Sequence, residues 1–355
     1  MAVIEVVVAI VSYQCADLTI ECLRSIEVER STPGLRIRAI VVDNASGDAP
    51  EIADAISSNA WSSWVTLISS PRNGGFGYGN NVAFRCAFDR GPPDYLHVLN
   101  PDTRLLKGAI GALVDFFETH PDAGIAGSSF ENQDGSEWRI AFRFPSILGE
   151  LEGGLQFRLA TRLLRRWAVA RQMGRVPEAT DWVGGASVMI RRKVVETIGG
   201  FDERFFLYYE ETDLCRRAKM AGFQTWYVPD SHVMHIGGQS TKAMERNARP
   251  ARLPACWFES RRHYFAANHG IAYAMALDMA ALTAHGLGRL KRLVQRRSDG
   301  GTPHYLWDLA RHSVLWPGNR KLARTGRQVG KYPGTCGPEG SRDRTCLHSE
   351  SRTSA

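Results

Sequence analysis

The chain has 355 residues, of which 44% are hydrophobic and 23% charged, the composition of a globular protein with one large domain or two modest ones. Its 44 basic and 37 acidic residues give a net charge of +7, which suits a partner that carries phosphate or another anionic group. We find no helix-turn-helix, zinc-finger or RNP pattern, so nucleic acid is not expected as a partner. Seven scattered cysteines without a Cys-x-x-Cys pair indicate reduced thiols in a cytoplasmic protein.

The first 130 residues alternate short, apolar, β-rich runs with helical patterns. This alternation is typical of a parallel sheet covered by helices on both faces, and it predicts an α/β fold. The expected strands are Ile4–Tyr13, Ile37–Asp43, Val65–Ser70, Tyr95–Asn100 and Gly124–Ser128, and the expected helices are Asp17–Glu27, Glu51–Ala60, Gly79–Phe88 and Leu106–Thr119.

The rest of the chain changes character twice. Residues 131–240 are expected to return to the sheet after an insertion that extends to about Pro177. Residues 241–317 are basic with helical spacing, and 318–355 have few large apolar residues and are expected to be disordered. Within these parts we expect helical spacing over Leu155–Ala170, a strand at Val183–Ile190, a helix near Tyr209–Ala221, a strand near Thr225–Val228 and one or two helices over Ala266–Gln295.

A membrane-spanning segment is not expected. The most apolar stretch, Gly270–Leu287, is interrupted by Asp278 and His285. The N-terminal run Val3–Val11 contains Glu5 and follows no basic region, so it is typical of a buried strand and not of a signal peptide. The apolar and basic residues near Arg289 suit either an anionic membrane surface or a face packed on the protein itself.

Polar residues follow three of the expected strands. Asp43 ends one of them, Asn100-Pro-Asp102 follows another, and a glycine-rich loop at Asn73, Gly74 and Gly75 follows a third. Ligands of open α/β sheets bind at the carboxyl ends of strands, so these side chains are expected to converge. Oxygen ligands there suit a hard divalent cation with a phosphate-bearing ligand, and glycines let the backbone approach it. The alternative for Asp43 and Asp102 is an ordinary turn.

A second group of titratable residues lies later in the chain. Glu210, Glu211 and Asp213 begin an expected helix behind a run of aromatic residues, where a carboxylate can act as a proton acceptor. Asp213 precedes Arg217 by four residues, so it is alternatively an ion-pair partner. His235 is a candidate metal ligand or a structural histidine.

Taken in order, these signatures strongly resemble those of family 2 glycosyltransferases with the GT-A fold, especially the bacterial rhamnosyltransferase-like branch. The resemblance covers about residues 5–240. It rests on Val-Ser-Tyr, Val-Val-Asp-Asn-Ala-Ser, Asn-Gly-Gly-Phe-Gly-Tyr-Gly-Asn-Asn, Leu-Asn-Pro-Asp-Thr, Trp-Val-Gly-Gly-Ala and Gly-Gly-Phe-Asp-Glu-x-Phe-Phe-x-Tyr-x-Glu-x-x-Asp-Leu-Cys-x-Arg.

The resemblance implies an inverting transfer of a sugar, with rhamnose from dTDP-rhamnose preferred. The donor is a nucleoside-diphosphate sugar, the cofactor Mg²⁺ or Mn²⁺, and the acceptor a glycan or lipid-linked hydroxyl in cell-surface polysaccharide synthesis at the inner face of the plasma membrane. Glu211 matches the catalytic base, and Asp102 and His235 match the metal site, in which the family commonly has Asp-x-Asp where this chain has Asn100. The donor residues implied are Ser12, Tyr13, Asp43, Asn73, Gly74, Gly75 and Asn100, and the acceptor residues Asp181 and Trp182.

Three alternative functions are compared with these motifs. A transferase that uses a UDP-hexose would share every motif. A non-catalytic binding or scaffold protein would retain the sheet but has no need of Asp43, Asp102, Glu211 and Asp213 together. A nucleotidyltransferase would be expected to carry a glycine-rich basic loop directly after the first strand, where this chain has Val-Ser-Tyr-Gln-Cys.

Overall fold

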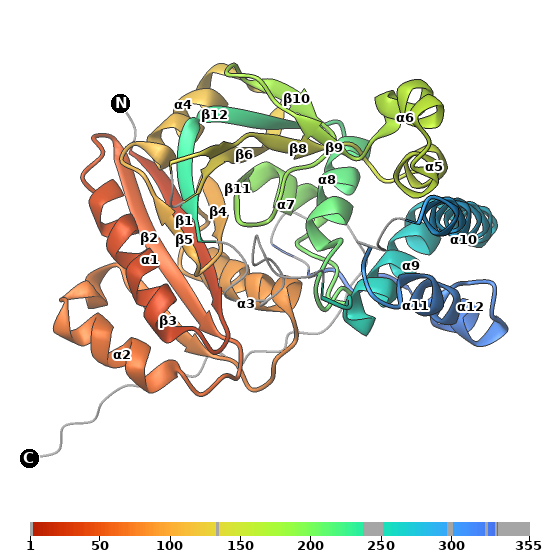
Figure 1. The fold of residues 1–355 in the computed structure, drawn as a ribbon. Coiled ribbons are helices and arrows are strands. Elements are labelled where there is room, and N and C mark those ends of the chain that lie inside the picture. The colour runs from red at the N-terminus through yellow and green to blue at the C-terminus, as the bar shows by residue number, and fades with distance from the viewer. Residues whose placement is uncertain are drawn as a thin grey trace, which may run out of the picture.

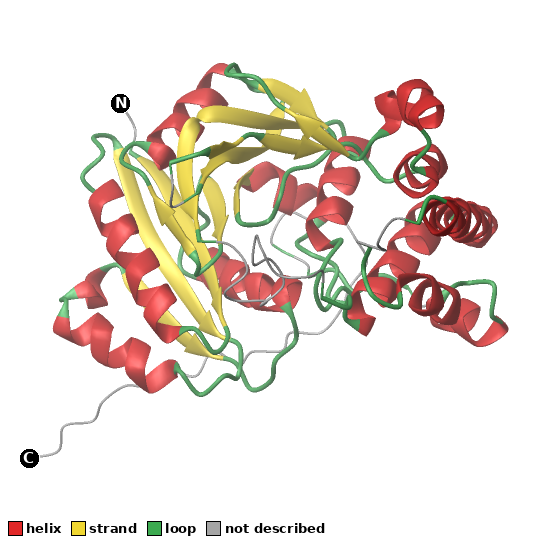
Figure 2. Ribbon diagram, viewed as in Figure 1, coloured by secondary structure: helices red, strands yellow, loops and turns green. Residues whose placement is uncertain are grey.

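The computed structural model describes residues 3–132, 135–236, 251–296, 301–323, 326–330 and 332. A curled mixed sheet forms one side of the molecule and a group of helices the other (Figures 1 and 2). The strands are β1 (Ile4–Ser12), β2 (Leu35–Asp43), β3 (Val65–Ser69), β4 (Tyr95–Leu99), β5 (Thr103–Leu105), β6 (Ala123–Glu131), β7 (Glu137–Trp138), β8 (Ile140–Phe142), β9 (Ala170–Gln172), β10 (Glu178–Thr180), β11 (Ser187–Arg191) and β12 (Gln224–His235).

The central sheet has the order β10-β12-β6-β11-β4-β1-β2-β3. Strands β4, β1, β2 and β3 are parallel, whereas β11 runs antiparallel to both of its neighbours. Short β5 pairs with the end of β12, and β7 with β6. Strands β8 and β9 form a separate pair. The parallel strands bring their carboxyl ends to one edge, as expected.

Helices cover both faces of the sheet. Along β1 the side chains alternate: Val6, Val8 and Ile10 pack towards α1, α2 and α4, whereas Val7 and Ala9 pack in the cluster that contains α3, α7 and α8. These helices are α1 (Ala16–Glu29), α2 (Ala49–Ser58), α3 (Phe76–Asp89), α4 (Ala109–Thr119), α7 (Arg192–Ile198) and α8 (Glu210–Met220). A short 3-10 turn, Trp61–Ser63, precedes β3.

The remaining helices gather beyond the sheet, on the right of Figure 1. They are α5 (Ile147–Leu155), α6 (Arg158–Leu164) with a 3-10 turn at Arg165–Trp167, α9 (Ala255–His269), α10 (Ile271–Val294), α11 (Tyr305–His312) and α12 (Pro317–Ala323). Two small apolar clusters, around Phe265 and Phe258, hold these helices together, except α6, which has no buried residue. Among the helices of the described residues, none is both long enough and apolar enough to cross a membrane.

Several sequence expectations needed correction. The helical spacing over Leu155–Ala170 is divided, because Gln156 adopts a left-handed φ of 52° after α5 and the chain becomes β9 at Ala170. The strand expected at Val183–Ile190 begins only at Ser187. By contrast, the expectation of one or two helices over Ala266–Gln295 is confirmed by α9 and α10, which separate at Gly270, where φ is +83°.

The C-terminal region also differs from its expectation. Residues 317–323 form α12, and residues 326–330 and 332 pack back on the sheet domain, where the Tyr332 ring contacts Phe84 and Phe88 and is 4% exposed. Disorder was therefore the wrong expectation for these residues. The other residues of 318–355 and the expected boundary near 241 lie outside the described part of the chain.

Candidate active site

The carboxyl ends of β1 and β2 lie side by side, with Ser12 paired to Asp43. Asp43 is 3% exposed, and its Oδ1 accepts hydrogen bonds from the amide and the hydroxyl of Ser46. The Asp43 carboxylate thus holds the turn that follows the strand end. Its contact with a nucleoside remains a prediction.

Ser12 does not face this edge. Its side chain is fully buried, and its Oγ accepts a hydrogen bond of 2.8 Å from Thr19 on α1. The expected contact of the Ser12 side chain with a nucleoside is therefore wrong. Tyr13, the next residue, is 40% exposed beyond the strand end and remains a candidate.

Asn44 links two loops of the site and was missed from the sequence. Its Nδ2 donates to Asn73 Oδ1 (2.9 Å) and to the Gly75 carbonyl (3.2 Å), and its Oδ1 accepts from the Gly74 amide (3.3 Å). The side chain is 3% exposed, so these bonds form in a dry environment. Its position directly after Asp43 was the one available signal.

Gly75 brings the glycine-rich loop against the segment that precedes α8. Its φ is +87°, and a Cβ there would lie 2.0 Å from the Phe206 carbonyl oxygen, which accepts a 3.0 Å hydrogen bond from the Phe76 amide. Only glycine tolerates both the dihedral angle and the close approach. The loop expected at the donor and the loop that leads to Glu211 are thus in direct contact.

We expect Gly75→Ala to lower the free energy of unfolding by about 3 kcal/mol, because the backbone strain and the clash with Phe206 act together. Urea unfolding measures the change. Gly286→Ala is the matched control, since Gly286 lies in α10 with no heavy atom within 4 Å of an added Cβ. A Gly75→Ala protein as stable as the native chain would contradict this packing.

Asp102 and His235 come together, as expected. His235 pairs with Thr103 across β12 and β5, and the Asp102 carbonyl accepts from the Ile236 amide at 3.0 Å. This pairing brings His235 Nε2 to 3.5 Å from Asp102 Oδ1. Asn100 lies next to them, its backbone held by Ala186 and Thr103.

These residues fit a divalent cation that takes further ligands from its substrate. Among the described residues, no group of three or more His, Cys, Asp and Glu side chains is assembled for a metal. The side chains brought together are one carboxylate and one imidazole, and a contribution of the Asn100 amide stays a prediction. Mg²⁺ is commonly held by one or two carboxylates together with substrate phosphates and water, so such a partial site suits it.

A cavity of 330 Å³ lies in front of α8. Glu211 lines it, and α8 begins directly after Tyr208 and Tyr209, whose φ angles of 71° and 69° are strained for bulky residues. Such strain is often retained at functional sites. The lining residues are Pro145, Ser146, Gly149, Glu150, Gly153, Val169, Trp182, Tyr208, Tyr209, Glu211, Thr212, Trp257, His285 and Tyr305.

The two glutamates at the start of α8 share a poorly hydrated environment. Burial raises the pKa of Glu211, although the Gly185 backbone hydrogen-bonds to its carboxylate. Burial and the neighbouring Glu211 charge raise the pKa of Glu210 well above its usual range. The Oε2 atoms of both side chains are buried without a hydrogen-bond partner among the described residues. Glu211 reaches the cavity, so it is the one placed to accept a proton there.

Asp213 has a different environment. Its Oδ2 accepts from Arg217 at 2.7 Å, and its Oδ1 accepts from Arg327 at 2.6 Å and Asn268 at 2.9 Å. Burial alone would raise the pKa of Asp213, but the two arginines outweigh it and hold the pKa below its ordinary value. These contacts correspond to the ion-pair alternative and not to a catalytic carboxylate.

Of the two expected acceptor residues, only Trp182 lines the cavity. Its ring stacks on Phe142 at 4.1 Å, and its Nε1 donates to the Arg143 carbonyl at 2.9 Å. Asp181 instead accepts from the Phe144 amide at 3.0 Å and from Lys219 at 2.7 Å. Asp181 therefore fixes the backbone that carries Trp182, and its expected contact with an acceptor is not supported.

Sequence reasoning missed the part of the cavity that the C-terminal helices and α5 supply. Glu150, His285 and Tyr305 come from α5, α10 and α11. Glu150 is held by Arg261 at 3.1 Å, and Arg261 also pairs with the buried Asp278. No local pattern in the sequence joins these three segments.

Comparison with known proteins agrees with this geometry. The profile described as "Glycosyltransferase like family 2" matches residues 4–251. N-acetylglucosaminyl-diphospho-decaprenol L-rhamnosyltransferase of Mycobacterium tuberculosis is 32% identical over 217 residues, which cover 58% of this chain and 68% of that protein. Rhamnosyltransferase WbbL of Escherichia coli K12 is 26% identical over 172 residues, covering 48% of this chain and 63% of WbbL.

Solved structures share the fold. The mannosyltransferase PcManGT from Pyrobaculum calidifontis, in complex with GDP-Man and Mn²⁺, superposes with a TM-score of 0.50 at 15% identity, covering 90% of this chain and 82% of that one. GalNAc-T7 with UDP, GalNAc and Mn²⁺ has a TM-score of 0.55 at 14% identity, covering 88% and 58%. The fold is thus GT-A-like, with a mostly parallel sheet and C-terminal helices. The chain belongs to glycosyltransferase family 2, and it is an enzyme that transfers a sugar from a sugar donor.

Proposed function

We propose that the protein transfers rhamnose from dTDP-rhamnose, with inversion, to a hydroxyl of a glycan or lipid-linked acceptor. The observation that carries this proposal is the buried Glu211 carboxylate in a cavity lined by Trp182, Trp257 and Tyr305. Aromatic faces are suited to the apolar side of a sugar ring. The choice of rhamnose draws support from the M. tuberculosis relative, whose name also specifies an acceptor linked through a diphosphate to decaprenol.

Glu211 takes the proton from the acceptor hydroxyl in this mechanism. The hydroxyl oxygen forms a bond to the anomeric carbon while the bond from that carbon to the diphosphate oxygen breaks, so the configuration inverts in one displacement. The raised pKa of Glu211 brings its basicity closer to that required of a general base near neutral pH. The surrounding aromatic side chains exclude water that would otherwise compete with the acceptor.

The nucleotide end is assigned to the sheet edge. Tyr13, Asp43, Asn73, Gly74, Gly75 and Asn100 are the proposed donor residues. Asp102 and His235 would hold a divalent cation, which when bound offsets negative charge on the diphosphate leaving group, an effect worth several kcal/mol. We assign residues 1–130 to the nucleotide-binding half and 131–240 to the acceptor half, with the helices after 240 as an extension.

We also propose that the protein acts in cell-surface polysaccharide synthesis at the inner face of the plasma membrane.

The direct test is binding of a panel of nucleotide sugars with Mn²⁺, Mg²⁺ or a chelator. We expect dTDP-rhamnose to bind best, and we expect Asp102→Ala to weaken its binding at least about tenfold, because a carboxylate that holds the cation beside the diphosphate is lost. Asp115→Ala, at an exposed carboxylate on α4, is the control and is expected to bind as the native chain does.

The outcomes separate the competing functions. Preference for a UDP-hexose would replace the rhamnosyl donor and leave the transferase mechanism intact. Binding of no nucleotide sugar under any condition would favour a non-catalytic member of the family. Equal binding with chelator and with cation, unchanged in Asp102→Ala, would reject the metal assignment alone.

A further inference from the structure

The outer face of α10 exposes large apolar side chains. Met279, Leu287, Leu290, Leu293 and Val294 are between 45% and 76% exposed. Their spacing places them on one side of the helix. The opposite side packs closely on α5, where a Cβ on Gly288 would lie 2.2 Å from the Gly154 carbonyl oxygen. One side of α10 therefore belongs to the protein, and the other carries an apolar stripe that no described part of the chain covers.

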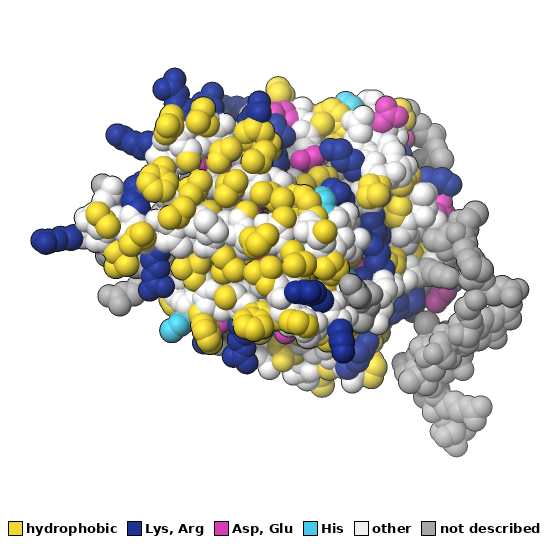
Figure 3. Space-filling model, turned by 90° about the vertical axis from the view of Figure 1, so that its right-hand side faces the viewer, with side chains coloured by type: hydrophobic (Ala, Val, Ile, Leu, Met, Phe, Trp, Pro, Cys, Tyr) yellow, Lys and Arg dark blue, Asp and Glu magenta, His cyan; other side chains and the backbone are white. Residues whose placement is uncertain are grey.

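Helix α6 continues this surface. Leu159 and Leu163 are 69% and 65% exposed, and the linker before α6 is joined to the end of α10 because Lys291 and Arg292 donate to Gln156. Figure 3 shows hydrophobic side chains gathered on this side of the molecule. We call the exposed sides of α6 and α10 the outer helical face.

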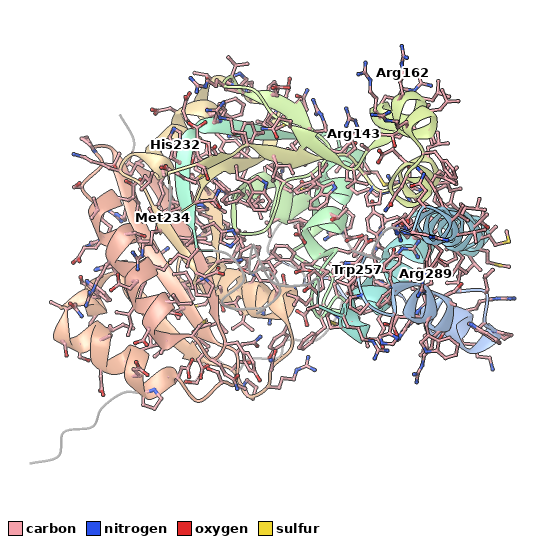
Figure 4. All side chains as sticks on the ribbon, viewed as in Figure 1. Arg143, Arg162, His232, Met234, Trp257 and Arg289 are labelled. Atoms are coloured by element: carbon pink, nitrogen blue, oxygen red, sulfur yellow. The ribbon has the colours of Figure 1, made fainter. Side chains whose placement is uncertain are left out.

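Basic residues border the outer helical face, and no acidic residue interrupts it along either helix. The sequence has no Asp or Glu between residues 153 and 177 or between 279 and 296. Figure 4 shows Arg162 on α6 and Arg289 on α10 at the end of the molecule away from β1 to β3. The Arg and Lys residues of α6, the turn after it, α10 and the turn that ends α10 are Arg158, Arg162, Arg165, Arg166, Arg289, Lys291, Arg292 and Arg296.

Tryptophans are exposed on the neighbouring helices. Trp307 of α11 is 66% exposed, and Trp316, just before α12, is 59% exposed. Leu322 of α12 is 60% exposed. Tryptophan side chains are enriched at the boundary between a bilayer and water, because their rings have an apolar body and a polar N–H. These residues extend the same chemistry beyond α10.

We propose that the outer helical face docks on an anionic lipid bilayer. Leucines flanked by arginines and lysines, without acidic residues, match a surface with an apolar interior and negatively charged headgroups. A second copy of the chain is a poorer partner, because a symmetric contact would place the same basic residues opposite one another.

The docked face lies beside the proposed acceptor site. Glu150 and Gly153 of α5, His285 of α10 and Tyr305 of α11 line the cavity that contains Glu211, and α10 carries the apolar stripe on its other side. Docking would therefore hold the cavity close to the bilayer, where the sugar of a lipid-linked acceptor is found. This last step rests on the proposed function, whereas the docking itself does not.

The test measures co-sedimentation of the full chain with vesicles of phosphatidylglycerol and phosphatidylcholine, and with vesicles of phosphatidylcholine alone. We expect binding to the anionic vesicles that weakens with added salt. Arg158→Glu with Arg162→Glu should weaken it at least about tenfold, because each basic residue near the surface contributes to the attraction. Leu290→Gln with Leu293→Gln should also weaken it, because two side chains of the apolar stripe become polar. Glutamine is nearly as compatible with a helix as leucine, so α10 should be retained.

Matched controls lie on the sheet side of the molecule. Arg36→Glu with Lys107→Glu changes the same charge at two exposed positions, and Val28→Gln removes an exposed apolar side chain from α1. Native-like binding by the outer-face variants, or weakening equal to that of the controls, would overturn the proposal. Self-association lost in Leu290→Gln with Leu293→Gln, without vesicle binding, would assign the face to a second copy instead. Vesicle binding needs no nucleotide sugar, so its failure is distinguishable from failure of the proposed transfer.

Discussion

Replacing Glu211 by glutamine is expected to lower turnover by about 10²- to 10⁴-fold while donor affinity stays close to that of the native chain. Glutamine has nearly the same shape but cannot accept the acceptor proton. The carboxylate has the properties of a base: it lines the cavity, its Oε2 lacks a hydrogen-bond partner among the described residues, and burial raises its pKa. Single-turnover rates and donor binding, measured on the same preparation, separate loss of chemistry from loss of binding.

Glu210→Gln is the matched control, because Glu210 is the adjacent buried carboxylate but is not among the cavity-lining residues. It is expected to retain most of the turnover. A large loss in Glu210→Gln together with normal turnover in Glu211→Gln would reverse the assignment of the base.

The pH profile of the same two proteins provides a second measurement. The base must be ionised, so kcat/KM should fall as the pH falls through the raised pKa of Glu211, and this acidic limb should lie above the range of an ordinary glutamate. Burial and the Glu211 charge raise the pKa of Glu210 well above its usual range, so Glu210 is neutral where Glu211 titrates, and Glu210→Gln should leave the limb in place. A limb that moves to lower pH in Glu210→Gln would mean that Glu210 is charged in that range.

The fold was largely predictable because its nucleotide half obeys local rules. Strands β1 and β2 contain continuous apolar runs at residues 6–11 and 39–42. Each run ends where a polar turn begins, so the pattern locates both the strand and the edge it leads to. The bounds of the antiparallel β11 and of the irregular β12 were harder to predict from the sequence. The register of β12 against β6 shifts between Val228 and His232, around Pro229, so only its first residues have a regular strand pattern.

The position of a candidate site residue was predictable where it lies at the end of a strand. Asp102 and His235 meet because β5 and β12 pair. The prediction for Ser12 was wrong because side chains alternate along a strand. Ser12 lies on the same face of β1 as Val6, Val8 and Ile10, which face α1, and its hydroxyl therefore bonds to Thr19.

The cavity itself could not be predicted, because it depends on packing between segments that are far apart in the sequence. Tyr305 reaches Glu211's cavity only through the arrangement of α9, α10 and α11. The prediction of disorder for the C-terminal segment was wrong for a similar reason. Its composition is that of a disordered chain, but Arg327 anchors it through an ion pair and Tyr332 through a buried ring.

Replacing Asp213 by alanine is expected to lower the free energy of unfolding by about 3–5 kcal/mol, a large part of the roughly 5–15 kcal/mol typical of a folded protein. Asp213 is fully buried and joins three parts of the chain: Arg217 on its own helix, Asn268 on α9 and Arg327 of the C-terminal segment. Its removal leaves Arg217, which is only 10% exposed, without its carboxylate partner. Urea unfolding measures the loss.

Glu21→Ala is the control, because the Glu21 side chain is 39% exposed and pairs with exposed arginines, so its loss should cost less than about 1 kcal/mol.

The pH dependence of the stability loss identifies its cause. The pKa of Asp213 is lowered in the folded state, so its ionisation contributes stability above its unfolded pKa of about 3.9 and loses that contribution as the pH falls towards the folded value. The difference between the native chain and Asp213→Asn should therefore shrink below about pH 4. A difference that is constant with pH would mean that Asp213 acts through packing alone. Because Asp213 lies two residues after Glu211 on α8, the ion pairs that stabilise the fold also hold the helix that presents the proposed base to the cavity.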